Sequence, residues 1–549
     1  MTEHEALCAT AQNEHRLGLL IMENRSGAAL AAGATHLRSA ADAWGAAQKP
    51  TRRAVCLLDL ARLLGRIEQH RRAAEAAAEA QTIFQVAGDS QQASDAASLA
   101  ALAHHASGQS VEAEARMREA LAISTELNDH LRMAQHQLDL ARILIARGAS
   151  YDAISVANEA REVFDDYRQQ VKSAECHEQL ALAFAAERDW EPASCHFEQS
   201  AQILLDLGRP FEGTQVLSRY ADVEVERGDG ANAVAILERC LKIQQQHGHQ
   251  ALQAQTWRLL GMVHRRLGDQ DRAHDAYRRS LEICLQLDDA AGRARTLYQI
   301  GSLMAEAGDH QQAMEQLQDS LAAAEASGNM RILERILAAL AKLYRQCGAH
   351  DQALQTMHRW TEVLRDLGDR QERLRVIGSI AKVHQERGAY DEAETHLRRL
   401  ISVCNPDDDV TELAFAEHGL AVILVARQQE AEAVEHFVRA LELMRRLGSD
   451  AVVTKRLPQV LHQYGNCLLQ LERADPALEC FNELLRLPVD QVGERLRARA
   501  LVGIGNAYAQ IGEERRAHDF FAQAASLCEQ QGDLRATRII RRATADGGL

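Results

Sequence analysis

A chain of 549 residues exceeds the roughly 250 to 300 residues over which one hydrophobic core grows, so the sequence requires either several domains or a repeat array. The formal net charge of −16 argues against nucleic acid as the default partner, because phosphate binding needs a basic footprint. The low content of proline, 7 residues, and of aromatics, 4%, favours helices.

The first segment, MTEHEALCATAQNEHR, has no basic stretch followed by an apolar core, so we expect no secretion signal. The most apolar run, around Leu420 to Ala426, is far shorter than the roughly 20 residues that span a bilayer. The 11 cysteines form no CxxC pair and no zinc spacing with histidines, and we interpret them as buried residues in a reducing compartment. These features predict a soluble, cytoplasmic protein.

The next feature is a pattern that repeats at intervals of 40 residues. The expected turn between two helices falls at Gly108, Gly148, Arg188, Gly228, Gly268, Gly308, Gly348, Gly388 and Gln428. An alanine follows five residues after each turn, from Ala113 to Ala433, and an alanine or glycine precedes most turns by seven residues. Two antiparallel helices approach closely only where both present small side chains, so the pattern predicts helix-turn-helix repeats.

The pattern predicts about 13 repeats in an all-α chain. Repeats 1–11 occupy residues 1–447, and one step of 44 residues places a longer loop between repeats at 448–457. Repeats 12–13 occupy residues 458–532, and residues 533–549 are expected to form a capping helix and tail. A solenoid needs such a cap because its last repeat has no neighbour to cover its apolar face. Whether residues 448–457 are a hinge or only a longer loop is left open.

This pattern resembles the tetratricopeptide repeat family. The residues that carry the resemblance are Trp257, Leu260, Gly261, Gly268, Ala273 and Tyr277, and later the segment Gly503 to Tyr508 followed by Gly512 and Ala517. The family's usual repeat has about 34 residues, whereas this one has 40, as in the LGN/Pins adaptors and bacterial regulatory repeat arrays that it resembles. The resemblance implies an α-solenoid wound as a right-handed superhelix, with the first helix of each repeat lining a concave groove.

On that arrangement, residues that precede each turn by 13, 10, 6 and 3 positions face the groove as one helical stripe. The middle repeats place basic side chains there: Arg258, Arg265, Arg295, Arg335, Lys342, Arg345, Arg375 and Lys382. A basic stripe in an acidic protein suits an acidic peptide or a C-terminal carboxylate. The alternative is that these side chains only solvate exposed helix faces.

Two asparagines, Asn466 and Asn506, occupy the same position in consecutive repeats. In related repeat proteins an asparagine there hydrogen-bonds the backbone of an extended peptide, and an amide suits this role because it both donates and accepts. The alternative is that asparagine is only the family's preferred residue at this position. Both asparagines join the eight basic residues as candidates for partner binding.

The sequence therefore predicts a non-catalytic scaffold that binds a partner peptide or domain in its concave groove, and the basic stripe, if it forms the binding surface, favours an acidic partner. The alternative is a signal-responsive repeat protein that controls an output protein in trans. No nucleophile and base constellation, phosphate-binding loop or His/Cys cluster is evident, so we expect no enzymatic activity, cofactor or metal. We expect neither nucleic acid nor a membrane as partner, and a homo-oligomer stays open.

Overall fold

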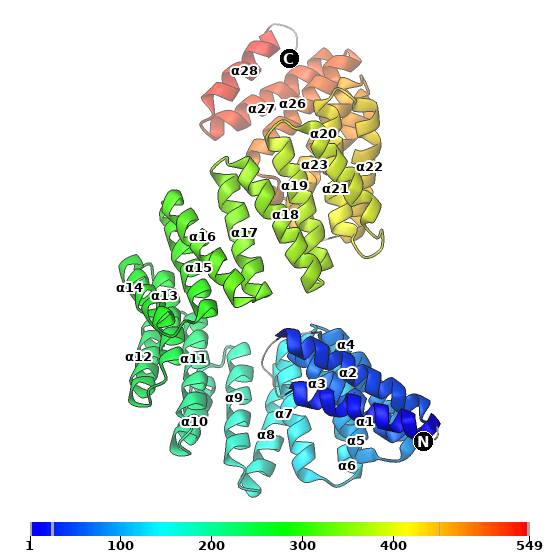
Figure 1. Ribbon diagram of the computed structural model, residues 1–549. Helices are drawn as coiled ribbons and strands as arrows, with labels where there is room; N and C mark the ends of the chain where they lie inside the picture. The colour runs from blue at the N-terminus through cyan, green and yellow to red at the C-terminus, as the bar shows by residue number, and fades with distance from the viewer. Residues whose placement is uncertain (1–2, 23–26, 68, 449–450, 546–549) are drawn as a thin grey trace. The chain divides into compact units, whose positions relative to one another are not determined.

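The computed structural model describes residues 3–22, 27–67, 69–448 and 451–545. All regular structure over these residues is α-helical, and successive helices form antiparallel hairpins in tandem along the chain (Figure 1). The chain is an α-solenoid of helical repeats, as the sequence predicts. Contacts divide it into two compact units, an N-terminal unit Met1–Ile283 and a C-terminal unit Cys284–Leu549.

The helices of the N-terminal unit begin and end as follows, with α14 extending three residues past its boundary: α1 Glu3–Met22, α2 Gly27–Ala46, α3 Pro50–Arg66, α4 His70–Ala87, α5 Ser90–Ala106, α6 Ser110–Glu126, α7 His130–Arg147, α8 Ser150–Asp166, α9 Gln170–Ala186, α10 Trp190–Asp206, α11 Pro210–Arg227, α12 Gly230–Gln246, α13 Gln250–Arg266 and α14 Gln270–Gln286.

The helices of the C-terminal unit are α15 Ala290–Ala307, α16 His310–Ser327, α17 Met330–Gln346, α18 His350–Leu367, α19 Arg370–Glu386, α20 Tyr390–Val403, α21 Val410–Ala426, α22 Glu430–Leu447, α23 Ala451–Gln470, α24 Ala474–Arg486, α25 Val489–Val492, α26 Glu494–Ile511, α27 Glu514–Gln530 and α28 Leu534–Ala545. Over the residues described, no helix is long and apolar enough to cross a membrane.

Turns that close with a left-handed residue separate these helices. All nine turn positions expected from the sequence have positive φ, including Gly108 at 81° and Gln428 at 60°. Glycine suits this conformation because it lacks a Cβ, and Arg188 adopts it at φ 61° without that advantage. A second series of residues with positive φ, which includes Gly88 and Asn128, lies halfway between successive expected turns. Residues of this series follow the second helix of a repeat. The backbone therefore turns at intervals of 20 residues in most of the chain.

The small residue seven positions before each turn makes room for the bulky residue nine positions after it. A Cβ added at Gly261 would lie 2.4 Å from the ring of Tyr277, and one added at Gly465 would lie 2.6 Å from the ring of Phe481. Both rings are fully buried. The close helix crossing predicted from the sequence is therefore present, and the side chain that requires it is the bulky residue of the second helix.

A repeated hydrogen bond joins the two helices of several repeats. The hydroxyls of Ser200, Ser280 and Ser320 each donate at 2.7 Å to the backbone carbonyl oxygen 26 residues earlier, on the first helix of the same repeat. All three serines are buried. Such a hydroxyl satisfies its own hydrogen-bonding need where the helices cross closely, which keeps the buried polar group from destabilising the core.

The prediction of a longer loop at 448–457 is wrong for most of these residues. Residues 449–450 lie outside the described residues. Helix α23 begins at Ala451, so at least seven of the ten residues are helical. The four extra residues lengthen the first helix of this repeat to 20 residues, where its neighbours α17 and α19 have 17. Pro458 consequently lies inside α23.

Helix α28 lies in the segment where the sequence predicts a capping helix. Helix α28 contacts α27, and Ile540 is buried in a cluster with Phe521 and Ala525. Residues 546–549 of the expected tail lie outside the described residues. Helix α28 thus covers apolar surface of the preceding helix pair, which is the role expected of a capping helix in a repeat array.

Candidate functional site

In the C-terminal unit, the predicted basic residues lie on three consecutive first helices, α15, α17 and α19. The side chains of Arg295, Arg335, Lys342 and Lys382 are exposed, and Arg345 is half-buried. Arg335 and Lys342 are seven residues apart, as are Arg375 and Lys382, so each pair shares one helix face. We call Arg295, Arg335, Lys342, Arg345 and Lys382 the basic face of the C-terminal unit.

None of the five residues of the basic face forms a salt bridge with another described residue. Arg375 differs, because its guanidinium donates to Glu372 at 2.8 Å and to Glu412 of α21 at 3.4 Å. The Glu412 side chain is only 12% exposed. Arg375 therefore joins α19 to α21, whereas the five residues of the basic face form no such link among the described residues.

Arg258 and Arg265 belong to α13 in the N-terminal unit, and both are half-buried and engaged within the chain. The Arg258 guanidinium lies 3.6 Å from the sulfur of Met262. Burial and the nearby Glu226 raise the pKa of the Asp222 carboxyl, while Arg266 and Arg258 act in the opposite direction. These two predicted residues lie in a surface of mixed charge, unlike the basic face.

Asn466 and Asn506 are equivalent in sequence but differ in their surroundings. The Asn466 side chain is exposed, and its amide nitrogen lies 3.5 Å from the His462 ring nitrogens. Asn506 is half-buried, and its Oδ1 accepts no hydrogen bond from the described residues. The structure therefore places the two amides in different environments, so they do not form a uniform row of peptide-binding groups.

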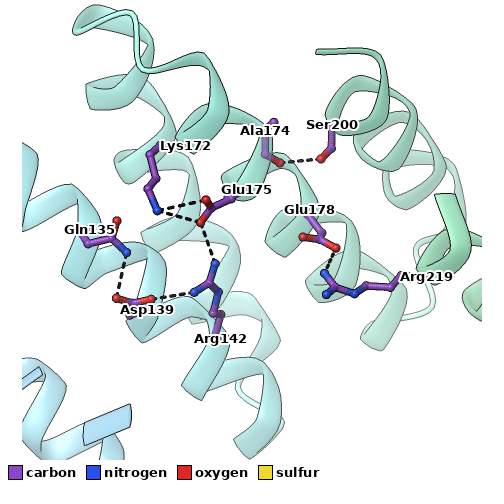
Figure 2. Close-up of polar contacts among 9 residues, drawn as sticks. All are labelled: Gln135, Asp139, Arg142, Lys172, Ala174, Glu175, Glu178, Ser200 and Arg219. Carbon is purple, nitrogen blue, oxygen red and sulfur yellow. Dashed lines mark hydrogen bonds and ion pairs between the residues drawn. The ribbon is translucent and has the colours of Figure 1, made fainter. Parts of the chain in front are cut away.

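A polar network that the sequence analysis did not predict joins α7 to α9 in the N-terminal unit (Figure 2). Arg142 donates to Asp139 at 2.9 Å and to Glu175 of α9 at 3.0 Å, and Lys172 lies 3.1 Å from Glu175. Gln135 donates to Asp139 at 3.0 Å. Burial raises the pKa of the Asp139 carboxyl, although the hydrogen bond from Gln135 and the charge of Arg142 oppose this shift.

A second link joins α9 to α11, where Arg219 donates to the buried carboxylate of Glu178 (Figure 2). The partners are 41 residues apart, whereas Arg142 and Glu175 are 33 apart. The pair on α19 and α21 described above is separated by 37 residues. From the shortest to the longest, these separations increase in steps of four residues, about one helical turn. Opposite charges at such spacings are the sequence signal that could have revealed the links.

A polar hollow of about 160 Å³ lies where α11, α12 and α13 meet, within the N-terminal unit. Gln215, Arg219 and Asp222 line it from α11, Gln255 lines it from α13, and Gln244 lines it from α12. The Gln244 side chain is buried, with the residue 2% exposed, and its Oε1 accepts no hydrogen bond from the described residues. Its sequence position on a second helix gave no hint of this role.

Histidine rings approach one another both within and between repeats: the His396 ring centroid lies 5.3 Å from that of His384 on α19 and 6.0 Å from that of His358 on α18. The Nδ1 atoms of His177 and His196 lie 2.9 Å apart, and burial with the neighbouring His196 lowers the pKa of His177 to about 4. In a later repeat the equivalent contact joins His436 Nδ1 to Glu417 at 2.5 Å. No group of three His, Cys, Asp or Glu side chains in the described part of the chain is placed to hold a metal ion.

Comparison with known families identifies the repeat. Residues 214–286 match one tetratricopeptide repeat model and residues 336–371 match another. The two matches lie in the middle of the chain, where the 40-residue pattern is strictest. No curated protein sequence matches the chain.

Among solved structures, the apo form of RapI is 16% identical, with 50% of this chain and 99% of that chain covered and a TM-score of 0.34. Aspartyl phosphate phosphatase F from Bacillus subtilis is 12% identical, with 66% and 94% covered and a TM-score of 0.35. A tetratricopeptide repeat protein from Parabacteroides merdae is 16% identical, with 53% and 99% covered and a TM-score of 0.34. The resemblance to the LGN/Pins adaptors stays a prediction.

Proposed function

The chain is a tetratricopeptide-repeat protein, and on this premise we propose that it is a non-catalytic scaffold whose first helices bind an acidic segment of a partner protein. Tandem helical repeats of this family support a role in protein interaction. The finer proposal concerns which surface binds and what charge the partner carries. It includes the predicted concave groove and the absence of catalytic activity.

The observation that carries this proposal is the basic face of the C-terminal unit. Its five cations lie on α15, α17 and α19, and none forms a salt bridge with another described residue. Elsewhere in the chain many arginines pair across repeats, for example Arg398 with Glu432 at 2.7 Å. Like charges that are not held in salt bridges repel one another, and an acidic segment would relieve that repulsion on binding.

Reversal of charge on the basic face tests this proposal. In Lys342→Glu/Lys382→Glu, both exposed cations become anions, and we expect affinity for a fluorescent glutamate-rich peptide to fall by at least about tenfold, or 1.4 kcal/mol. The dependence of binding on salt should become shallower, because fewer opposite charges interact. Fluorescence anisotropy at several salt concentrations measures both effects.

The matched control is Lys242→Glu, which reverses an exposed lysine on the second helix α12. Lys242→Glu reverses one charge, whereas the test variant reverses two. The single variant Lys342→Glu is therefore also measured, so that variants with the same number of reversed charges are compared. We expect Lys242→Glu to bind the peptide as the unmodified chain does. Equal binding by the double variant and the unmodified chain would remove the basic face from the proposal.

The proposal includes predictions about location and about the classes of partner. The cytoplasmic location rests on the sequence, as does the exclusion of nucleic acid and membrane partners. Homo-oligomer formation stays open. Control of an output protein in trans remains the alternative function, and no contact among the described residues favours it over a scaffold.

A further inference from the structure

The lining of the hollow between α11, α12 and α13 includes a buried amide whose acceptor is unused. Gln244 is 2% exposed, and its Oε1 has no hydrogen-bond donor among the described residues. Its backbone carbonyl, by contrast, accepts from the Gln253 side chain at 3.2 Å. Buried polar side chains almost always find a partner, so a buried amide that lines a hollow without one indicates a site for a hydrogen-bonding group.

Two charged residues line the hollow, and the cation among them is already paired. Arg219 and Asp222 are the charged residues that line it, one cation and one anion. The Arg219 guanidinium is already engaged by Glu178 (Figure 2), and Asp222 lies near Arg258 and Arg266. A carboxylate would therefore meet no free cation in the lining, and it would enter at the cost of its own hydration.

The remaining polar groups suit a neutral occupant. Three glutamine side chains, Gln215, Gln244 and Gln255, line the hollow, and each amide offers both donors and an acceptor. Leu252 and Leu259 supply apolar contact on the α13 side. A primary carboxamide on an apolar stem matches this lining, because it donates to one amide oxygen while it accepts from another amide nitrogen.

The size of the hollow limits the occupant to a single side chain. Its volume is about 160 Å³, below the roughly 300 to 1,000 Å³ of pockets that bind small molecules or cofactors. It is nevertheless several times the roughly 30 Å³ that one water molecule occupies. A side chain projecting from a bound segment fits between these limits.

We propose that the hollow between α11, α12 and α13 binds the carboxamide side chain of a glutamine or asparagine in a partner segment. The site confers specificity for a neutral residue at one position of that segment, and the Gln244 amide is its central group. This inference rests on the proposed function, since it assumes that a partner segment lies along the first helices. It adds a requirement that the basic face does not impose.

A random peptide library displayed on phage tests the inference with the full chain as bait. The unmodified chain should enrich peptides that carry glutamine or asparagine at one fixed position. In Gln244→Leu that preference should disappear, because leucine fills the same space without an amide. The matched control is Gln245→Leu on the adjacent exposed residue, which should retain the preference. If Gln244→Leu does not fold by circular dichroism, Gln255→Leu takes its place.

Three outcomes would overturn the inference. They are enrichment that does not change in the Gln244 variant, a preference for charged residues that depends on Gln244, and enrichment of no peptide at all. The anisotropy measurement with the glutamate-rich peptide decides the proposed function separately. A chain that binds that peptide through Lys342 and Lys382 but shows no carboxamide preference would keep the scaffold and lose this site.

Discussion

Single residues fix where each helix pair closes and how tightly it packs. Gly261 and Tyr277 meet because glycine leaves the space that the ring occupies, with only 2.4 Å available to an added Cβ. Arg188 holds the left-handed turn at φ 61°, where most repeats use glycine. The same turn and packing positions recur along the chain, so the effect of one substitution can be compared with that of an equivalent one elsewhere.

Gly261→Ala should destabilise the N-terminal unit by about 1 to 3 kcal/mol, since overpacking of a filled core costs this much. The matched control is Gly65→Ala in helix α3, where an added Cβ meets nothing within 4 Å. That control should be neutral or stabilising by about 0.5 kcal/mol, because alanine favours helix over glycine. Thermal unfolding followed by circular dichroism measures both, and a smaller loss for Gly261→Ala than for the control would contradict the packing account.

Arg188→Gly should stabilise the chain by about 1 kcal/mol, because the left-handed conformation costs an L-residue roughly 1 to 2 kcal/mol that glycine does not incur. Gly228, at the equivalent turn, has φ 94°, so Gly228→Ala should lower the stability by a similar amount. The midpoints of thermal unfolding of the two variants should move in opposite directions. A shift of both in the same direction would show that the turn conformation does not govern stability here.

Between elements, the first helices of the N-terminal unit are tied together by charged side chains. Arg142 joins α7 to α9, and Arg219 joins α9 to α11 (Figure 2). The carboxylates are more buried than their arginine partners: Glu178 has a side-chain exposure of 9% and Arg219 one of 54%. A partly exposed pair of this kind contributes less than a buried one, because solvent screens the arginine.

A double-mutant cycle of Glu178→Gln and Arg219→Met should give a coupling free energy of about 0.5 to 1 kcal/mol, in the range of exposed ion pairs. The single variant Glu178→Gln should be less stable than the unmodified chain. Chemical unfolding of the four proteins of the cycle measures the coupling. A value of zero would mean that the α9–α11 link does not stabilise the stack.

The Asp139 carboxyl has a raised pKa through burial, which means that folding favours its protonated form. Its charge therefore costs folding stability near neutral pH, and this cost is lost as the pH falls through the raised folded-state pKa and below the pKa of the unfolded chain. We expect Asp139→Asn to be more stable than the unmodified chain at neutral pH, with the difference shrinking in acid. Unfolding measured over a pH series checks this, and a difference that grows in acid would contradict the assignment.

The sequence predicted the elements well and the links between them poorly. The 40-residue period and small residues such as Ala273 reveal helix pairs because close crossing imposes a local pattern. The hollow at Gln244 and the network at Asp139 depend on side chains from neighbouring repeats, and no local pattern marks them. The period of 44 residues reveals that four residues are inserted near 448–457 but not that they are helical, whereas α23 begins at Ala451.

At the scale of the whole molecule, the net charge of −16 conceals an uneven distribution. The N-terminal unit carries paired charges on α7, α9 and α11 and a polar hollow beside α12. The C-terminal unit carries the basic face on α15, α17 and α19. Each unit thus offers a partner a different chemistry: amide recognition in the N-terminal unit and attraction of negative charge in the C-terminal one.

The central claim is that first helices bind the partner, and hydrogen–deuterium exchange measured by mass spectrometry tests it most directly. With the glutamate-rich peptide bound, we expect slower amide exchange in α15, α17 and α19 than in the free chain. Exchange in the second helices α16, α18 and α20 should change little, because the peptide does not contact them. Protection confined to the second helices, or no protection in either set at a peptide concentration that saturates binding, would contradict the account.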